Sequence, residues 1–394
     1  MSVSPPLADT SSIVGNTSSV IADTSSVIAD TSSTASVIAR AKPEAIHFSV
    51  IVPVYNRPDE IEELLSSLAH QTDMDFDIVI VDDGSTLKCE DVCKKYANRL
   101  NINYFFKPNS GRSETRNYGI ERATGNYFIV FDSDCIVPPQ YIETVRACLK
   151  DDYSDCYGGP DNADASFSDT QKAINYAMTS FFTTGGIRGG KKSGFSPRSF
   201  NMGFSREVYE KVGGFKNMIA EDIELSYRIG QNGFRTTLYR DAYVYHKRRV
   251  SFKKMFRQVR TFGKGRVMLR GIDRSLLKIV HLLPMAFVLG HLLLFGLAAG
   301  FAVYSSVEAC GTTSAYGGGT AETFICGTWW LPLLPVALYI LLLFADAAVR
   351  NKSIKIGFMA VAASYIQLTG YGIGMMEEFL SRSASKKKQE ELYR

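Results

Sequence analysis

The chain has no cysteine framework. Its seven cysteines are scattered, and Cys89 and Cys93, four residues apart, have no second pair of candidate ligands to match them. A disulfide-stapled secreted domain and a structural zinc site are therefore disfavoured.

The first 44 residues lack the continuous apolar core of a signal peptide. Residues 7–34 repeat a seven-residue unit four times, with serine and threonine in every unit and too few apolar side chains for a core. We therefore predict a disordered, repeat-containing arm over residues 1–44. A short coiled coil is the alternative, although one apolar edge gives it little support.

The chain also lacks a strong overall charge or hydropathy. Its net charge of +4 and mean hydropathy of −0.03 are typical of a soluble protein. These averages combine a polar segment, residues 45–248, with an apolar tail that contains three long hydrophobic runs. The two parts therefore have to be interpreted separately.

Three apolar runs in the polar segment end in polar, turn-forming residues. They cover residues 48–54, 76–81 and 127–131, and each is followed by a helix-like stretch. Strands buried on both faces read as continuous apolar runs, and strands that alternate with helices form a parallel sheet. The predicted fold class is α/β, a mostly parallel sheet flanked by helices. Because ligands collect beyond the carboxyl ends of such strands, the run ends predict one pocket.

Asp132 and Asp134 follow the third run and are the most informative residues of the chain. Two carboxylates at a strand end suit a hard divalent cation, which in turn holds a diphosphate. A single Asp-x-Asp is more often a turn or a helix cap. Here Asn56 and Asp82-Asp83 end the other two runs, so the three together predict a nucleotide-diphosphate site.

Four motifs, in their order along the chain, resemble those of the family 2 glycosyltransferases, which are inverting enzymes with the fold known as GT-A. The resemblance covers about residues 46–270 and implies a GT-A domain over residues 45–248. It also implies a nucleotide-sugar donor, with UDP favoured by the second motif. The motifs are Val-Ile-Val-Pro-Val-Tyr-Asn at 50–56, Val-Asp-Asp-Gly-Ser at 81–85, the Arg-Asn segment at 109–119, and Glu221-Asp222.

The resemblance and the side-chain chemistry together assign the donor site. Pro53 and Tyr55 would flank the base. Asp83 would accept the uracil N3–H while Asp82 orients the loop, with an ordinary turn as the alternative. Arg116 lies at the family position for phosphate or ribose, and Arg112 and Lys107 compete with it. The predicted donor-binding residues are Pro53, Tyr55, Asn56, Asp82, Asp83, Gly111, Arg116, Asn117 and Asp132.

The predicted metal residues are Asp132, Asp134 and His246. Asp134 would bind Mn²⁺ or Mg²⁺ directly, and Asp132 would reach the ribose or a metal-bound water. His246 would complete the metal shell, as a histidine does in some GT-A enzymes. A hydrogen-bonded structural histidine is the alternative.

Asp222 is the predicted general base, because an inverting transfer needs a carboxylate to take the proton of the acceptor hydroxyl. A pair of carboxylates at a helix start could also merely favour the helix dipole. Asn201, Glu221 and Gln258 are the predicted contacts to the acceptor or the sugar. Gln258 lies where processive members of the family carry Gln-x-x-Arg-Trp, and the missing Arg-Trp pair disfavours a processive synthase.

Three apolar segments, residues 279–303, 328–345 and 356–376, reach the length of about 20 residues that crosses a bilayer. Twelve basic residues and one acidic residue lie between 247 and 278, whereas residues 305–327 contain no basic residue. This asymmetry predicts a cytoplasmic enzyme domain. Cys310 and Cys326 lie in the predicted outside loop and could pair if that compartment is oxidising.

The third apolar segment conflicts with this orientation, because crossing would export the basic tail, residues 381–394. A re-entrant or interfacial helix is the alternative, and Gly370, Gly372 and Gly374 would permit a bend. Residues 249–275 predict an amphipathic basic helix on the anionic leaflet. Its apolar stripe consists of Phe252, Met255, Phe256, Val259 and Phe262.

The sequence therefore predicts a multi-pass enzyme of the plasma (inner) membrane, with two to three transmembrane or re-entrant helices over residues 276–380. It would transfer a sugar from a nucleotide diphosphate to a lipid-linked saccharide or a surface polysaccharide at the cytoplasmic face. Nucleic acid is not an expected partner, since it would not explain three apolar segments. A catalytically inactive nucleotide-sugar-binding scaffold and a processive synthase are the alternatives.

Overall fold

The computed structural model describes residues 45–162, 167–185, 195–247, 251–311 and 329–392. A seven-stranded sheet has the order β3-β2-β1-β4-β8-β6-β9. Within these described strands β8 is antiparallel to β4 and β6, and the other four pairs are parallel. The prediction of a mostly parallel sheet is confirmed. The strands are β1 (Phe48–Val54), β2 (Phe76–Asp83), β3 (Ile102–Lys107), β4 (Tyr127–Val130), β6 (Cys156–Gly158), β8 (Met202–Ser205) and β9 (Thr236–Leu238).

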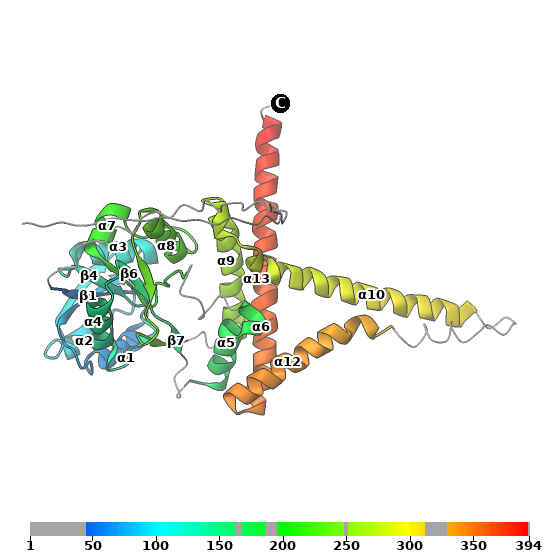
Figure 1. Cartoon of the computed structure of the whole chain (residues 1–394), viewed down its shortest axis with the longest axis horizontal. Helices are drawn as coiled ribbons and strands as arrows, with labels where there is room; N and C mark the ends of the chain where they lie inside the picture. Colours follow the sequence, from blue (N-terminus) through cyan, green and yellow to red (C-terminus); the bar gives the residue numbers. More distant parts are fainter. Residues whose placement is uncertain (1–44, 163–166, 186–194, 248–250, 312–328, 393–394) are drawn as a thin grey trace, which may run out of the picture. The chain divides into compact units, whose positions relative to one another are not determined.

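Helices cover both faces of this sheet (Figure 1). Alternate residues of β1 point to opposite faces, so Val50 and Val52 pack under one layer while Ile51 packs under the other. A Cβ on Gly119 would lie 2.9 Å from Ile51, so glycine allows the helix there to pack closely on the sheet. One layer contains α1 (Pro58–Leu68), α2 (Glu90–Tyr96) and α4 (Tyr141–Asp151), and the other α3 (Arg112–Arg122), α7 (Arg206–Val212) and α8 (Glu221–Gln231).

A second sheet of three short strands lies at the carboxyl end of β4. Its order is β5 (Cys135–Ile136), β10 (Val244–His246) and β7 (Asp161–Asn162). β10 is antiparallel to β5, with His246 opposite Cys135. This pairing brings a histidine from late in the chain next to the carboxylates that follow β4.

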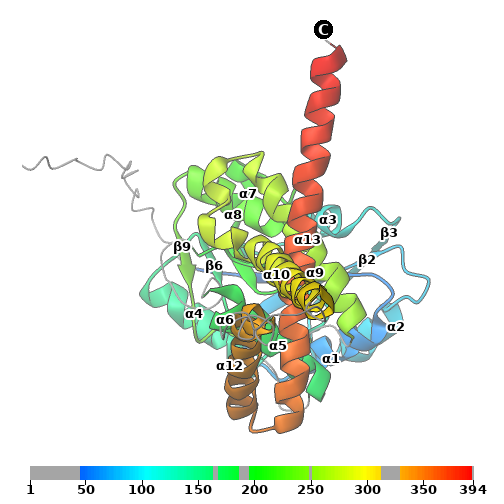
Figure 2. The ribbon, with the colours of Figure 1, turned by 90° about the vertical axis from the view of Figure 1, so that its right-hand side faces the viewer.

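The C-terminal helices are joined to the enzyme domain through α5 (Asp169–Thr179) and α13 (Ile354–Leu392). α13 contacts α5, α9 (Phe252–Arg270), α10 (Leu283–Gly311) and α12 (Leu334–Asn351), and it lies beside α9 in both views (Figures 1 and 2). Tyr176 of α5 donates a hydrogen bond to Asp346 of α12 at 2.7 Å. The other helices of the described residues are α6 (Phe181–Thr184) and the 3₁₀ turns η1 (Arg274–Leu276), η2 (Ile279–Leu282) and η3 (Leu331–Leu333).

The apolar stripe of α9 faces protein, which corrects the prediction that it rests on a lipid leaflet. Met255 and Val259 are fully buried, and Phe252 and Phe262 pack in the same cluster. Their partners include residues of α5 and Ala363 of α13. An apolar helix face can be covered by lipid or by neighbouring helices, and here two helices cover it.

The glycines of the third apolar segment permit close helix packing and not a bend, because α13 continues through them. A Cβ on Gly374 would lie 2.0 Å from the carbonyl oxygen of Arg260, and one on Gly370 would lie 2.6 Å from Val259. A Cβ on Gly263 of α9 would likewise lie 2.1 Å from the carbonyl oxygen of Tyr371. Small residues on both helices let the two backbones approach.

Among the described residues, three helices are long and apolar enough to cross a membrane. The candidate spans are Ile279–Ser306, Leu331–Asn351 and Ile354–Ser383, with mean hydropathies of 2.1, 2.1 and 1.3. In the most apolar 18 residues of each, the share buried inside the protein is 6%, 17% and 50%. Of these three candidate spans, that of α13 is therefore the one that the protein itself covers most. The predicted arm over residues 1–44 and the pairing of Cys310 with Cys326 concern residues outside the described side chains.

Candidate active site

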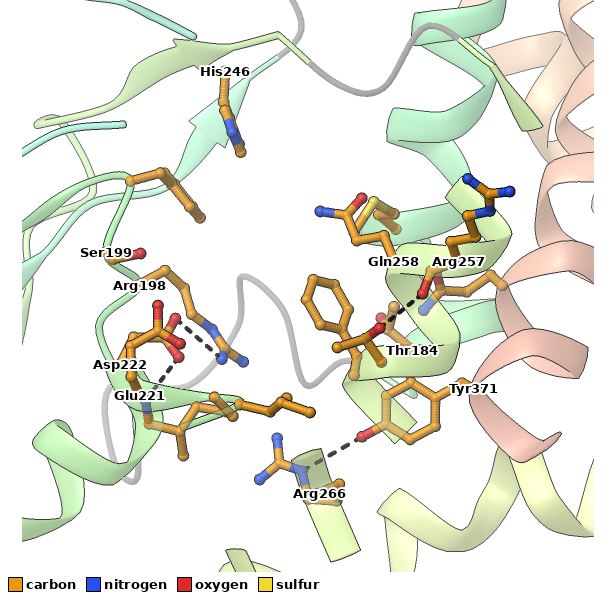
Figure 3. Close-up of a pocket in the computed structure, with 18 of the residues that line it drawn as sticks. Thr184, Arg198, Ser199, Glu221, Asp222, His246, Arg257, Gln258, Arg266 and Tyr371 are labelled. Carbon is orange, nitrogen blue, oxygen red and sulfur yellow. Dashed lines mark hydrogen bonds and ion pairs between the residues drawn. The ribbon is translucent and has the colours of Figure 1, made fainter. Parts of the chain in front are cut away.

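A cavity of about 520 Å³ lies at the carboxyl end of β4, between the sheet and α9 (Figure 3). Polar residues from the edge of the sheet form one wall, and α9 forms a second. The beginning of α10 and the middle of α13 form the third. The lining residues include Asp132, Asp134 and His246, then Arg198, Glu221 and Asp222, and on the helical side Gln258, Arg266 and Tyr371.

Asp132, Asp134 and His246 come together in this cavity. One possible ligand atom from each lies within 4.8 Å of the others. His246 Nε2 lies 3.1 Å from Asp134 Oδ1, and His246 Nδ1 lies 3.7 Å from Asp161 Oδ2 on the neighbouring β7. Two carboxylates and an imidazole fit Mn²⁺ or Mg²⁺, and Asp161 would orient the histidine from behind. The metal-ligand roles stay a prediction.

Ser133, between the two aspartates, turns away from the cavity. Its hydroxyl donates to Glu60 Oε2 of α1 at 2.7 Å. Burial raises the pKa of Glu60, and the Ser133 hydrogen bond opposes part of that rise. This contact anchors the turn between β4 and β5 to α1.

Arg116 is buried and positions the carboxylates, which corrects the prediction that it contacts phosphate or ribose. Its side chain is 3% exposed; it donates to Asp132 Oδ1 at 2.7 Å and to Glu221 Oε1 at 2.9 Å. Burial alone would lower the pKa of Arg116, but these two carboxylates raise it. Asn117 is likewise occupied, because its amide exchanges two hydrogen bonds with the backbone of Phe215. Both side chains are thus held by protein partners.

Glu221 and Asp222 begin α8 in different surroundings. Glu221 lines the cavity but is buried at 3% exposure and pairs with Arg112 and Arg116, and its predicted contact with the acceptor stays a prediction. Asp222 lines the cavity and accepts from its following backbone N–H, of Ile223, at 2.8 Å. Its other oxygen lies 3.7 Å from Arg198 Nη1. The carboxylate available to a substrate is therefore that of Asp222.

Hydrogen bonds between their own polar residues hold the loops after β1 and β2 together. Asp82 is buried and accepts from Ser85 N–H at 2.9 Å, which agrees with its predicted loop-orienting role. Asn56 Oδ1 accepts backbone N–H groups of Thr86 and Leu87. Asn56 is thus a structural link between the loops and not a free donor-site side chain.

Asp83 joins the β2 end to the start of α3. It accepts from the backbone N–H groups of Ser110 and Gly111, both at 2.9 Å, and from Lys107. Burial would raise the pKa of Asp83, but Lys107 and the hydrogen bonds lower it overall. Lys107 is 8% exposed and committed to Asp83, so it does not compete for phosphate.

Tyr55 and Pro53 remain accessible at the end of β1. Tyr55 is 52% exposed, and Pro53 is partly buried. Neither they nor Asp83 line the cavity of Figure 3. The predicted base-binding residues therefore lie apart from the cavity that holds Asp222.

Asn201 is fully buried and does not reach a sugar, contrary to the prediction. Its amide donates to the carbonyl oxygen of Ala242 at 2.8 Å and accepts from the Tyr141 hydroxyl at 2.6 Å. It therefore ties β8 to the segment before β10. Gln258, in contrast, lines the cavity on α9.

The sequence interpretation missed Arg198, Ser199, Arg266, His281 and Tyr371 as cavity residues. Arg266 belongs to the basic stretch that was assigned to the membrane surface. No sequence signal distinguished Arg198 or Tyr371, because their place in the cavity depends on contacts between distant segments.

Comparison with known proteins identifies the domain that carries this cavity. Residues 49–213 match the model of glycosyl transferase family 2, so this part of the chain is a family 2 glycosyltransferase domain. The prediction of this family is confirmed.

Two curated relatives and one solved structure illustrate the similarity. The uncharacterized glycosyltransferase YibD of Escherichia coli (strain K12) is 33% identical over 175 residues, which are 43% of this chain and 50% of the relative. The poly(ribitol-phosphate) beta-N-acetylglucosaminyltransferase TarS of Staphylococcus aureus (strain Mu50 / ATCC 700699) is 37% identical over 112 residues, 27% of this chain and 20% of the relative. The chain thus spans half or less of these relatives' lengths.

The mannosyltransferase PcManGT from Pyrobaculum calidifontis, solved with GDP-Man and Mn²⁺, aligns with a TM-score of 0.50 at 16% identity. The alignment covers 86% of this chain and 91% of that one. It confirms the predicted GT-A type of fold.

Proposed function

We propose that the chain is an inverting, divalent-metal-dependent glycosyltransferase that moves one sugar from a nucleotide diphosphate to an acceptor at a membrane surface. The observation that carries the proposal is that Asp132, Asp134 and His246 line the same cavity as Asp222. A cation site for the leaving group and a separate carboxylate for the acceptor's proton are what this transfer requires.

Each residue has a defined part in the proposed reaction. Asp134 and His246 would hold the cation, and Arg116 keeps Asp132 in place beside them. When bound, the cation neutralises the charge that develops on the diphosphate. The acceptor oxygen attacks C1 of the sugar, the C1–O bond to the diphosphate breaks with its electron pair on the diphosphate, and Asp222 takes the hydroxyl proton.

UDP is the proposed nucleotide. Tyr55 is exposed enough to stack on a base, and the loop that Asp83 ties to the start of α3 lies at the end of the neighbouring strand β2. The similarity of residues 49–213 to the family model supports these positions as the donor side.

We propose that α10 and α12 cross the membrane and that α13 stays on the cytoplasmic side with the enzyme domain. The candidate spans of α10 and α12 are 6% and 17% buried, whereas that of α13 is 50% buried and less apolar. α10 also runs across α13 instead of along it (Figures 1 and 2). Two crossings leave the basic stretch 247–278 and the basic tail on the same side, as the positive-inside rule requires.

Turnover of a panel of nucleotide sugars by the purified full-length chain tests the proposed function. We expect slow Mn²⁺- or Mg²⁺-dependent hydrolysis of one nucleotide sugar, which stops on chelation and falls when Asp222 is replaced by Asn. Nucleotide-sugar binding without turnover by the unmodified chain would instead favour a binding scaffold.

A further inference from the structure

The cavity extends beyond Asp222 toward the beginning of α10, and this end is rich in cations. Arg198 and Arg266 line it, and Figure 3 shows both guanidinium groups pointing into the cavity from different segments. His281 of η2 lines the same end, and Arg198, Arg266 and Lys278 are the cations that act on it electrostatically.

Within the described residues, Arg266 has no carboxylate partner and Arg198 has one long contact to a carboxylate. Arg266 donates to the carbonyl oxygen of Leu276 at 3.1 Å and lies 3.4 Å from the Tyr371 hydroxyl, and both partners are uncharged. Arg198 has a single carboxylate near it, Asp222, at 3.7 Å. A half-buried guanidinium without an anion is costly, so this end of the cavity favours an anionic ligand.

The wall beyond the cations is apolar and belongs to the start of a candidate membrane span. Val280, Leu283 and Pro284 line the cavity there, and Leu283 is 53% exposed. The span that begins at Ile279 is 6% buried inside the protein. A ligand that follows this wall out of the cavity therefore passes from cationic to lipid-like surroundings.

Resting on the function proposed above, we propose that Arg198 and Arg266 bind the phosphate group of a lipid-linked saccharide acceptor. Its hydrocarbon chain would leave along the start of α10, and its sugar hydroxyl would face Asp222. Arginine forms paired, charge-assisted hydrogen bonds to phosphate. The neutral Tyr371 and the carbonyl oxygen of Leu276 hold Arg266 without cancelling its charge. The Arg198–Asp222 contact keeps the phosphate site next to the proposed base.

The donor diphosphate is a weaker explanation for the same cations. Its charge would be met by a cation at Asp132, Asp134 and His246, at the other end of the cavity in Figure 3 from Arg266. A water-soluble anion would not need the apolar wall at Val280, Leu283 and Pro284. A single ligand with a phosphate head and an apolar chain uses both features.

Equilibrium dialysis of radiolabelled farnesyl phosphate with the detergent-solubilised full chain tests the site. We expect R198Q and R266Q each to weaken binding roughly tenfold or more, the scale of a lost charge-assisted hydrogen bond. R266K, which keeps the charge, should recover part of the affinity. The matched control is K253Q, which removes the same charge from an exposed position of α9 that does not line the cavity.

Comparison of ligands on the unmodified chain needs no variant. Farnesol, which lacks the phosphate, and inorganic phosphate, which lacks the chain, should each bind at least tenfold more weakly than farnesyl phosphate. Equal binding of farnesol, equal binding of inorganic phosphate, or unchanged farnesyl phosphate binding in folded R198Q and R266Q would overturn the inference. Metal-dependent nucleotide-sugar hydrolysis by the unmodified chain, measured in parallel, shows separately whether the proposed function holds.

Discussion

Replacing each of the adjacent carboxylates Glu221 and Asp222 by its amide should impair a different property. The Glu221 change should lower stability, and the Asp222 change should lower turnover. Glu221 is 3% exposed and pairs with Arg112 at 2.8 Å and with Arg116 at 2.9 Å. Breaking a buried ion pair from one side leaves a buried charge uncompensated, and we expect Glu221→Gln to cost about 3 kcal/mol. At about 2–4 °C per kcal/mol for a domain of this size, its Tm should fall by roughly 6–12 °C.

Asp222→Asn should leave stability nearly unchanged, since its carboxylate accepts from one backbone N–H and is 3.7 Å from Arg198. Loss of a general base should lower turnover by roughly 10² or more while donor affinity changes only a few-fold. Thermal melting, donor titration and steady-state turnover of the two variants separate these effects. A wild-type Tm for Glu221→Gln, or collapse of donor affinity in Asp222→Asn, would refute the assigned division of roles.

Four further predictions follow from individual contacts. Chelation with EDTA and the substitution His246→Gln should both abolish metal-dependent turnover. The control His70→Gln, at an exposed position, should leave turnover unchanged. Full activity of Asp134→Ala in metal-free buffer would contradict the metal site. Gly263→Ala should lower Tm, because its Cβ would lie 2.1 Å from the Tyr371 carbonyl oxygen. The control Gly290→Ala, with open space around it, should be neutral or stabilising. Equal Tm values of the two variants would show that α9 and α13 are not in close contact. Replacing Phe252, Phe256 and Phe262 together by Ser should lower Tm and should reduce sugar transfer and nucleotide-sugar hydrolysis equally. The reason is that Phe252 and Phe262 pack in the cluster between α5, α9 and α13. Loss of transfer alone would restore the membrane-surface interpretation. Finally, a Cys placed at Ser383, in a chain with Cys310 and Cys326 changed to Ser, should resist an impermeant maleimide on intact cells and react after permeabilisation; labelling of intact cells would mean that α13 crosses the membrane.

The sequence alone determined the three central strands β1, β2 and β4 of the sheet, the family and the location of the carboxylates. Continuous apolar runs identify buried parallel strands, and the carboxyl ends of such strands meet at one edge of the sheet. Asp132, Asp134 and the Asp82-Asp83 pair could therefore be assigned to strand ends without knowledge of their contacts. His246, which ends a short strand-like run, was assigned to the metal from the resemblance to GT-A enzymes.

Only the tertiary structure decided which polar side chains are free to meet a ligand. Arg112 and Arg116 lie on the same helix, yet the Arg112 side chain is 59% exposed and that of Arg116 is 3% exposed between two carboxylates. Asn201 has the same donors and acceptors as any surface asparagine, but Tyr141 and Ala242 occupy them. Such differences depend on partners far away in the chain, which a local pattern does not contain.

The helical part shows the same limit. The apolar stripe of α9 predicts a covered face but not what covers it, because lipid and a neighbouring helix satisfy an apolar face equally well. α13 and α5 cover it, and the glycines that suggested a bend are the places where the α9 and α13 backbones meet. Helical periodicity follows from local sequence, whereas the choice of partner follows from the packing of segments more than 100 residues apart, such as Arg260 against Gly374.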